Sequence, residues 1–212
     1  MKNLNLQKIK AVIFDFDETL YSGGDWSKYY NYCTGAFIKE GMFENAQQVF
    51  DELKRFCPTN ENFGFRVAKY LKIKNIDIGF YRSYLNDNIY DFMTDNVTAV
   101  DDELLKLLKK KYKMFMISDS PKSHVDFYMD KFGLSQKHFD EVYLNSFREG
   151  DFTKKFYMNQ IMEKHHLKPD EVLMIGDSAL SDMKPAKELG LQHFQVFSTN
   201  DTKNIINSLL NA

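Results

Sequence analysis

Five short apolar runs, separated by segments with helical periodicity, are the feature that most limits how this chain can fold. The runs cover residues 11–14, 114–117, 142–144, 172–175 and 194–197. Short runs that are apolar without alternation are typical of parallel strands buried on both faces. Parallel neighbours need a crossover between them, and a helix usually supplies it. The pattern therefore predicts an α/β fold, a doubly wound and mostly parallel sheet with helices on both faces.

Apolar side chains at helical spacing occupy the segments between these runs. Two such sets are Leu104, Leu107 and Leu108, and Val125, Met129 and Phe132. A third helix is expected over about residues 155–166. The segment 181–190 predicts a fourth, with Asp182 near its N-cap and Gly190 just beyond its end.

Residues 21–96 break the alternation. We expect no strand there, but several amphipathic helices, one of them with Ala46, Val49 and Leu53 on a single face. This segment holds 17 of the 32 Phe, Tyr and Trp residues, enough for a small core of its own. The pair Gly23-Gly24 and the pair Asp95-Asn96 are suited to be hinges. We therefore predict a Rossmann-like core of residues 1–22 plus 97–212, with a helical cap of residues 23–96 inserted after the first strand.

The composition argues against several classes of protein. A formal net charge of -2 does not favour binding to nucleic acid or to an anionic membrane. No apolar run approaches the ~18 residues of a membrane span. The first residues start basic and turn apolar, as in a signal peptide, but the apolar stretch is too short and no small-residue cleavage site follows. Cys33 and Cys57 are too few for a disulfide framework, and we expect both to be ordinary buried side chains. A cytoplasmic protein is the expectation, and its oligomeric state is not indicated.

Polar clusters follow three of the apolar runs. Asp15 and Asp17 follow the first run, Ser118 follows the second, and Asp177 follows the fourth. The carboxyl ends of the strands meet at one edge of an open α/β sheet, so the three acids are expected to converge. If the first strand continues through residue 17, Asp15 and Asp17 also point the same way. Oxygen ligands without His or Cys favour a hard cation, most simply Mg²⁺.

Four elements in this order resemble the motifs of the haloacid dehalogenase superfamily. They are Asp15-x-Asp17-x-Thr19, Ser118 at the end of MFMIS, a lysine in FTKKF, and the segment from Gly176 to Asp182. The helical segment after the first motif lies where one type of cap is inserted in that family. The resemblance covers nearly the whole chain, and it suggests a phosphatase-type member similar to phosphoglycolate phosphatases or nucleotidases.

The resemblance implies a role for each catalytic residue. Asp15 would be the nucleophile that forms an aspartyl-phosphate, and Asp17 would be the general acid and then the general base. Ser118 and a lysine would hold the phosphate oxygens, on which transition-state charge is spread. Either Lys154 or Lys155 could be that lysine, and we choose Lys154.

The resemblance also implies a metal and a set of substrate contacts. The metal is Mg²⁺, and its candidate ligands are Asp15, Asp17, Asp177 and Asp182, the last acting through water or orienting the lysine instead. Candidate substrate contacts are Thr19, Asp119, Tyr21 and Trp26. Asp119 departs from the family, in which Asn is commoner, and an acid beside a phosphate is unfavourable unless it points away.

Together these features predict a Mg²⁺-dependent phosphatase for a small phosphorylated metabolite. An acid at residue 17 favours phosphate esters over carbon–halogen bonds, because a departing halide needs no proton. Two alternatives stay open. One is a phosphomutase of the same superfamily, although mutases more often carry Gly-Val in place of Glu18-Thr19. The other is a non-catalytic protein that senses a metabolite or carries a phospho-aspartate.

Overall fold

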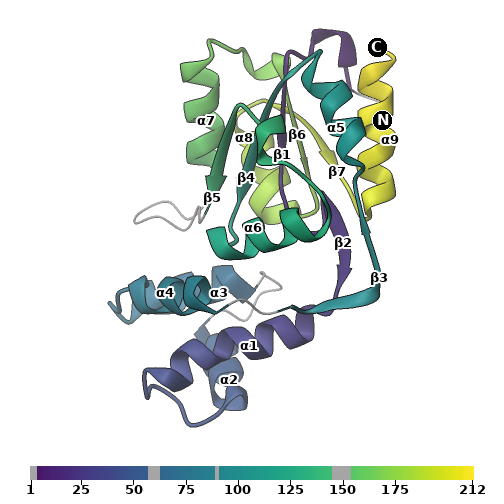
Figure 1. Ribbon diagram of the computed structural model, residues 1–212. Coiled ribbons are helices and arrows are strands. Elements are labelled where there is room, and N and C mark those ends of the chain that lie inside the picture. The colour runs from purple at the N-terminus through teal and green to yellow at the C-terminus, as the bar shows by residue number, and fades with distance from the viewer. Residues whose placement is uncertain (1–3, 57–62, 89–90, 145–153) are drawn as a thin grey trace. The chain divides into compact units, whose positions relative to one another are not determined.

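The computed structural model describes residues 4–56, 63–88, 91–144 and 154–212. The chain divides into two compact units (Figure 1). The first unit contains Met1–Gly23, Asn96–Ser120 and Tyr128–Ala212, and the second contains Gly24–Asp95 and Pro121–Phe127. Both ends of the inserted segment fall one residue from the expected boundaries. Residues 121–127, which were expected in the core, group with the second unit instead.

The first unit is built on a five-stranded parallel sheet, as the apolar runs predict. Its strand order is β5-β4-β1-β6-β7, with β1 at the centre. The strands are β1 (Ala11–Phe14), β4 (Lys113–Ser118), β5 (Glu141–Leu144), β6 (Val172–Gly176) and β7 (Gln192–Gln195). The last strand begins and ends two residues earlier than expected, and the N–H of Val196 just beyond it still donates to the carbonyl oxygen of Gly176 at 2.9 Å.

Helices cover both faces of this sheet. Ile13, Phe115 and Met174 face α7 (Lys155–Lys164) and α8 (Lys184–Glu188), in one buried cluster with Met158 and Ile161. Side chains alternate along a strand, so Val12 and Met116 point to the opposite face. On that side α5 (Asp102–Lys109) packs against α9 (Thr199–Leu210), as Figure 1 shows. The predicted α/β architecture is confirmed.

The expectation that no strand lies in residues 21–96 was wrong. β2 (Tyr21–Gly24) pairs with β3 (Met93–Ala99) in a small separate sheet, and the boundary between the two units runs through both strands. Their sequences, YSGG and MTDNVTA, are too polar to show a buried strand pattern. Gly23 has a φ of +106°, and a Cβ there would lie 2.9 Å from the carbonyl oxygen of Asn96. Close pairing of the two backbones therefore requires glycine at this position.

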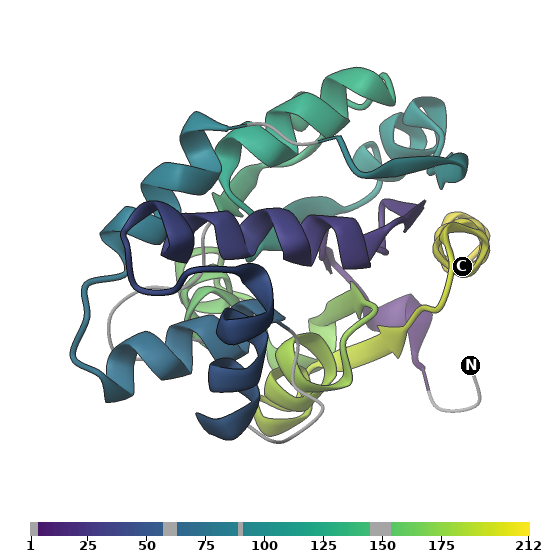
Figure 2. The ribbon, with the colours of Figure 1, turned by 90° about the horizontal axis from the view of Figure 1, so that it is seen from below.

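The second unit consists mainly of helices. Its helices are α1 (Trp26–Lys39), α2 (Ala46–Phe56), α3 (Phe63–Ile73) and α4 (Gly79–Asp87), and the first residues of α6 (Lys122–Lys131) join them. Figure 2 shows α1 to α4, in dark to mid-blue, packed on one another. Phe37, Val49 and Leu53 lie in their shared apolar core, and Cys33 is buried there as expected. Cys57 lies outside the described residues.

Short helical turns complete the described chain. They are η1 (Leu6–Lys8), η2 (Gln136–His138), η3 (Pro169–Glu171) and the π-helical turn η4 (Ala179–Met183). The helix expected over residues 155–166 ends at Lys164, and His166 takes a positive φ just after it. Among the described helices, none combines the length and the apolar character that a membrane crossing requires.

Candidate active site

Three strands of the first unit bring polar residues to one edge of the sheet. Asp15 directly follows β1, Ser118 is the last residue of β4, and Asp177 directly follows β6. The backbone N–H of Asp15 donates to the carbonyl oxygen of Ile175 at 2.9 Å, so pairing of β1 with β6 continues to the site. Parallel pairing thus places these residues at the same edge of the sheet.

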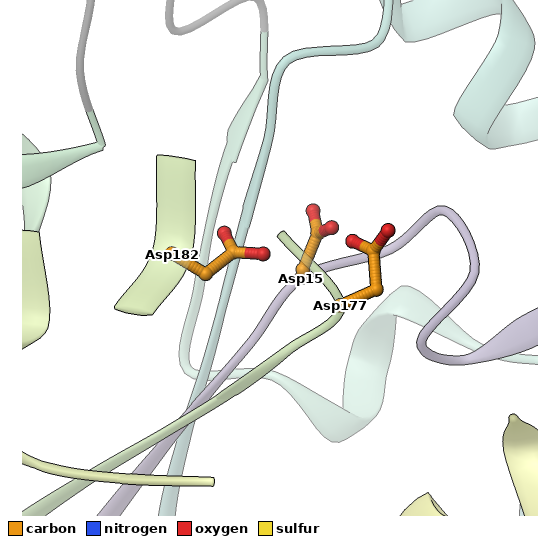
Figure 3. Close-up of side chains that lie close together, drawn as sticks. All are labelled: Asp15, Asp177 and Asp182. Atoms are coloured by element: carbon orange, nitrogen blue, oxygen red, sulfur yellow. The ribbon is translucent and has the colours of Figure 1, made fainter. Parts of the chain in front are cut away.

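Three carboxylates gather at this edge. Asp15, Asp177 and Asp182 each offer an oxygen, and these oxygens all lie within 4.8 Å of one another. Figure 3 shows the carboxylate of Asp15 between those of Asp182 and Asp177. Asp15 and Asp182 are buried, and Asp177 is half-buried. Carboxylates approach this closely at a cost unless positive charge lies among them.

Lys154 supplies part of that charge. Its Nζ donates to Oδ1 of Asp15 at 2.6 Å and to Oδ1 of Asp182 at 2.7 Å, and its side chain is only 2% exposed. Lys155 points elsewhere, since its exposed ammonium pairs with Glu188 at 2.9 Å. Of the two lysines left open by the sequence, the structure brings Lys154 to the acids.

Asp182 reaches the site in an unexpected way. It lies one residue before Met183, the N-cap of α8, as predicted, but it also lies inside the π-helical turn η4, whose own cap is Ser178. Its Oδ2 accepts a hydrogen bond from the backbone N–H of Ser178 at 3.0 Å. Gly176 makes room for it, since a Cβ there would lie 2.3 Å from the same oxygen. The tight turn needs this glycine, and it delivers Asp182 to Lys154.

Asp17 is not one of the three clustered acids, although its charge, in addition to burial, raises the pKa of both Asp15 and Asp177. The strand does not continue to residue 17, because the chain turns after Phe14 and Glu18 takes a φ of +54°. The hydroxyl of Tyr21 donates to Oδ1 of Asp17 at 2.5 Å, and that of Ser120 donates to Oδ2 at 2.5 Å. The Ser118 hydroxyl is 3.4 Å from Oδ2. Both carboxylate oxygens of Asp17 therefore accept hydrogen bonds. Asp17 was predicted as a metal ligand, but its oxygens are not in the cluster of Asp15, Asp177 and Asp182.

The candidate substrate contacts fall in different surroundings. Thr19 is fully buried, and its Oγ1 has no hydrogen-bond partner within the described part of the chain. Tyr21 is also fully buried, whereas Asp119 is half-buried. Trp26 belongs to the second unit, where its ring packs against Phe92 at a centroid distance of 4.7 Å. Among these residues, Tyr21 hydrogen-bonds to Asp17 through its buried hydroxyl.

Sequence reasoning did not assign Ser120. Its hydroxyl bonds to Asp17, and its backbone N–H donates to Oγ of Ser118 at 3.0 Å. The only signal for it was its place in the polar run Ser118-Asp119-Ser120 after a predicted strand, and that run does not say which residue turns inward.

The electrostatics of the site reflect a surplus of negative charge. Burial lowers the pKa of Lys154, but the carboxylates of Asp15 and Asp182 outweigh it and hold that pKa well above its ordinary value. Burial raises the pKa of Asp15 well above its usual range, with further increases from Asp182 and Asp177 and an opposing effect of Lys154. Burial first, and Asp182 second, raise the pKa of Asp177 to about 6. Burial likewise raises the pKa of Asp119 to about 6.

This donor set fits a hard divalent cation. Oxygens of three carboxylates lie within 4.8 Å of one another, and Lys154 pairs with two of these acids, so its single charge does not balance all three. The donors are all oxygen atoms, which suit Mg²⁺ and not a thiolate- or imidazole-preferring metal. The residues present therefore match the metal that the sequence predicts.

Comparison with known families covers most of the chain. Residues 12–196 match the family model described as haloacid dehalogenase-like hydrolase. A curated relative, the phosphoglycolate phosphatase of Vibrio vulnificus, is 28% identical over 96 residues. That match covers 45% of this chain and 41% of the relative, so it spans less than half of either protein.

Solved structures share the fold. A haloacid dehalogenase-like hydrolase from Streptococcus pneumoniae is 20% identical, with a TM-score of 0.56 over 94% of this chain and 91% of the other. A family member from Bacteroides thetaiotaomicron, in complex with magnesium and inorganic phosphate, is 19% identical, with a TM-score of 0.50 over 88% and 93% of the two chains. The matched family model, the sheet topology and these likenesses agree: the chain belongs to the haloacid dehalogenase-like hydrolase family.

Proposed function

We propose that this protein is a Mg²⁺-dependent phosphatase that hydrolyses a small phosphorylated metabolite through an aspartyl-phosphate on Asp15. The observation that carries the proposal is the hydrogen bond from the ammonium group of Lys154 to Asp15. Asp15 lies in a cluster of three carboxylates, and the single charge of Lys154 does not balance them. A second acid, Asp17, follows two residues later with its carboxylate fixed in a separate position. A nucleophile and a separate acid are the two groups that this hydrolysis needs.

The metal would be held by Asp15 and Asp177. Asp182 is less suited as a direct ligand, because its two oxygens already accept hydrogen bonds from Lys154 and from the N–H of Ser178. Its role in the proposal is to orient Lys154. Bound Mg²⁺ would offset the charge of the carboxylates and of the substrate phosphate.

The first chemical step transfers the phosphoryl group to the protein. A carboxylate oxygen of Asp15 attacks phosphorus, and the bond between phosphorus and the ester oxygen breaks. Asp17 donates its proton to that oxygen, which leaves as an alcohol. Lys154 and the Ser118 hydroxyl would hold the remaining phosphate oxygens, which carry the transition-state charge.

The second step releases phosphate. Asp17, now ionised, accepts a proton from a water molecule as that water attacks the phosphorus of the aspartyl-phosphate. The bond from phosphorus to the Asp15 oxygen breaks, so Asp15 returns as a carboxylate and Asp17 regains its proton. Each group ends the cycle as it began, which is the requirement for turnover.

The comparisons support this choice of reaction without fixing the substrate. The curated relative is a phosphoglycolate phosphatase, and a solved relative was obtained with magnesium and phosphate. Both descriptions agree with a phosphate ester as substrate. Trp26 remains a candidate substrate contact in this proposal.

The test measures phosphate release from a panel of phosphorylated metabolites, with Mg²⁺ or with EDTA, for the wild type, Asp15→Asn and Asp170→Asn. Asp170 is a matched control, because it is an exposed acid paired with Lys8. We expect turnover that requires the metal and falls at least ~10³-fold in Asp15→Asn, with Asp170→Asn unchanged. Acid quenching should trap phosphate on Asp15, detectable by peptide mass spectrometry.

Three outcomes would count against the proposal. Isomerisation of a phosphorylated substrate without net phosphate release would establish a phosphomutase. Metabolite binding without turnover, by folded protein at saturating Mg²⁺, would establish a sensor. A folded and fully active Asp15→Asn variant would remove Asp15 from the mechanism.

A further inference from the structure

Two short hydrogen bonds of Asp17 come from residues to which nothing above assigns a catalytic role. Tyr21 donates to one carboxylate oxygen and Ser120 to the other, each at 2.5 Å. A carboxylate held at both oxygens cannot rotate without breaking a hydrogen bond. The orientation of Asp17 is therefore set by these two hydroxyl groups.

Tyr21 is itself held rigidly. Its side chain is fully buried, and its ring lies 5.1 Å from that of Phe16, 5.4 Å from that of Tyr128 and 5.3 Å from that of Phe132. Three aromatic neighbours leave the ring little freedom, so the hydroxyl occupies one position. A fully buried ring also offers no surface to a substrate. Its polar tip serves Asp17 instead.

Ser120 links Asp17 to the second motif. Its hydroxyl donates to Asp17 while its backbone N–H donates to Oγ of Ser118, at 3.0 Å. Ser118 Oγ thus accepts from this N–H, and its own proton is donated toward Oδ2 of Asp17 at 3.4 Å. Ser120 therefore sets the spacing between Asp17 and Ser118, the two groups expected on opposite sides of the breaking bond.

We propose that Tyr21 and Ser120 are positioning residues, which hold the carboxyl group of Asp17 where it delivers a proton to the leaving oxygen. This inference rests on the proposed phosphatase function and adds residues to it. Neither residue touches the reacting atoms in the proposal. A misplaced acid should therefore slow proton donation and leave the binding of the phosphate group intact.

Leaving groups of different basicity separate this role from a structural one. An alkyl phosphate expels an alcohol and needs the proton, whereas p-nitrophenyl phosphate expels a stable anion and needs it little. The quantity to compare is kcat/KM, because it reports the steps up to departure of the leaving group. The variants are Tyr21→Phe, Ser120→Ala and Ser120→Thr.

A matched control is available in the same unit. Tyr112→Phe also removes one hydroxyl hydrogen bond, from Tyr112 to the carbonyl oxygen of Leu209 at 2.8 Å. We expect Tyr21→Phe and Ser120→Ala to lower kcat/KM for the alkyl phosphate by about 10- to 100-fold, and for p-nitrophenyl phosphate by under ~3-fold. Ser120→Thr keeps the hydroxyl and should restore most of the activity. Tyr112→Phe should match the wild type on both substrates.

Equal losses on the two substrates, or no loss on either, would overturn the inference. Crystal structures of the wild type and Tyr21→Phe add a readout that does not depend on activity: Asp17 should have one orientation in the first and several in the second. An inactive wild type would refute the proposed function and with it the role in proton delivery, whereas these structures would still decide whether Tyr21 positions Asp17. A single unchanged orientation of Asp17 in Tyr21→Phe would refute it.

Discussion

The ammonium group of Lys154 lies 2.7 Å from Oδ1 of Asp182, and both side chains are at most 2% exposed. Asp182 is in turn fixed by the backbone N–H of Ser178. Burying two charges costs desolvation energy, which their mutual attraction offsets. Replacing one of the two residues therefore leaves the other as an unpaired charge in the core. The relationship makes the position of Lys154 depend on the turn that follows β6.

Replacing Lys154 should therefore damage both stability and activity. We expect Lys154→Met to lower kcat/KM by about 10²- to 10³-fold, because a donor to the phosphate oxygens is lost. The free energy of unfolding should fall by about 3 kcal/mol, because Asp15 and Asp182 lose their shared partner. The matched control is Lys155→Met, which removes only an exposed pair with Glu188. Steady-state kinetics and urea denaturation measure the two quantities. Equal losses of kcat/KM and of unfolding free energy in Lys154→Met and Lys155→Met would contradict the role given to Lys154.

The turn after β6 gives a second prediction. Gly176→Ala would place a Cβ 2.3 Å from Oδ2 of Asp182, so Asp182 must move and Lys154 with it. We expect a loss of about 1–3 kcal/mol in stability from overpacking, together with a large loss of kcat. Gly133→Ala is the control, because its φ of +64° makes it strained but nothing lies within 4 Å of the added atom. It should lose stability without losing activity, and comparable kinetic losses in both variants would contradict the argument.

The cluster of Asp15, Asp177 and Asp182 predicts that Asp177→Asn changes thermal stability in opposite directions with and without Mg²⁺, relative to the wild type. In EDTA, Asp177→Asn should raise the melting temperature, because burial and the nearby Asp182 raise the pKa of Asp177 and make its charge unfavourable. With Mg²⁺, the wild type should gain stability through ligand binding and the variant should gain little. Differential scanning fluorimetry across a Mg²⁺ titration measures both effects. A variant that is less stable in EDTA and equally stabilised by Mg²⁺ would refute this account.

Much of the fold could be read from the sequence because buried strands leave a strong signal. The run Ala-Val-Ile-Phe gives β1 to the residue, since it is apolar on both faces. The polar strands β2 and β3 leave no such signal, because their pairing depends on backbone hydrogen bonds and on Gly23. Tertiary contacts decide such segments, and a local pattern does not contain them.

The site shows the same division. Placement of Asp15, Ser118 and Asp177 follows from the parallel sheet, so the sequence could predict their meeting. The direction of Asp17 could not be predicted, because it depends on the turn at Glu18 and on hydroxyl groups from Tyr21 and Ser120. These donors lie 4 and 103 residues away along the chain, and only the folded chain brings them together.

Glu141, at the start of β5, predicts how stability depends on pH. Burial raises its pKa, but hydrogen bonds from Tyr143, Lys164 and His165 outweigh burial and lower it to about 2. A carboxyl group whose pKa is lowered on folding stabilises the protein above its unfolded pKa of 4.5, and that stabilisation is lost as the pH falls toward 2. We estimate it at about 1–2 kcal/mol at pH 7, less than the full shift implies because Lys164 is largely exposed.

Glu141→Gln should remove more stability at neutral pH than at acidic pH. Urea denaturation at pH 7 should find the variant less stable than the wild type, and at pH 3 the difference should shrink, because the wild type then keeps only part of the benefit of its charge. Glu188→Gln is the control, since its pair with Lys155 is exposed on both sides and is screened by solvent. A deficit of the Glu141→Gln variant that is the same at both pH values would mean that the hydrogen bonds act through packing alone, and that the charge of Glu141 contributes nothing.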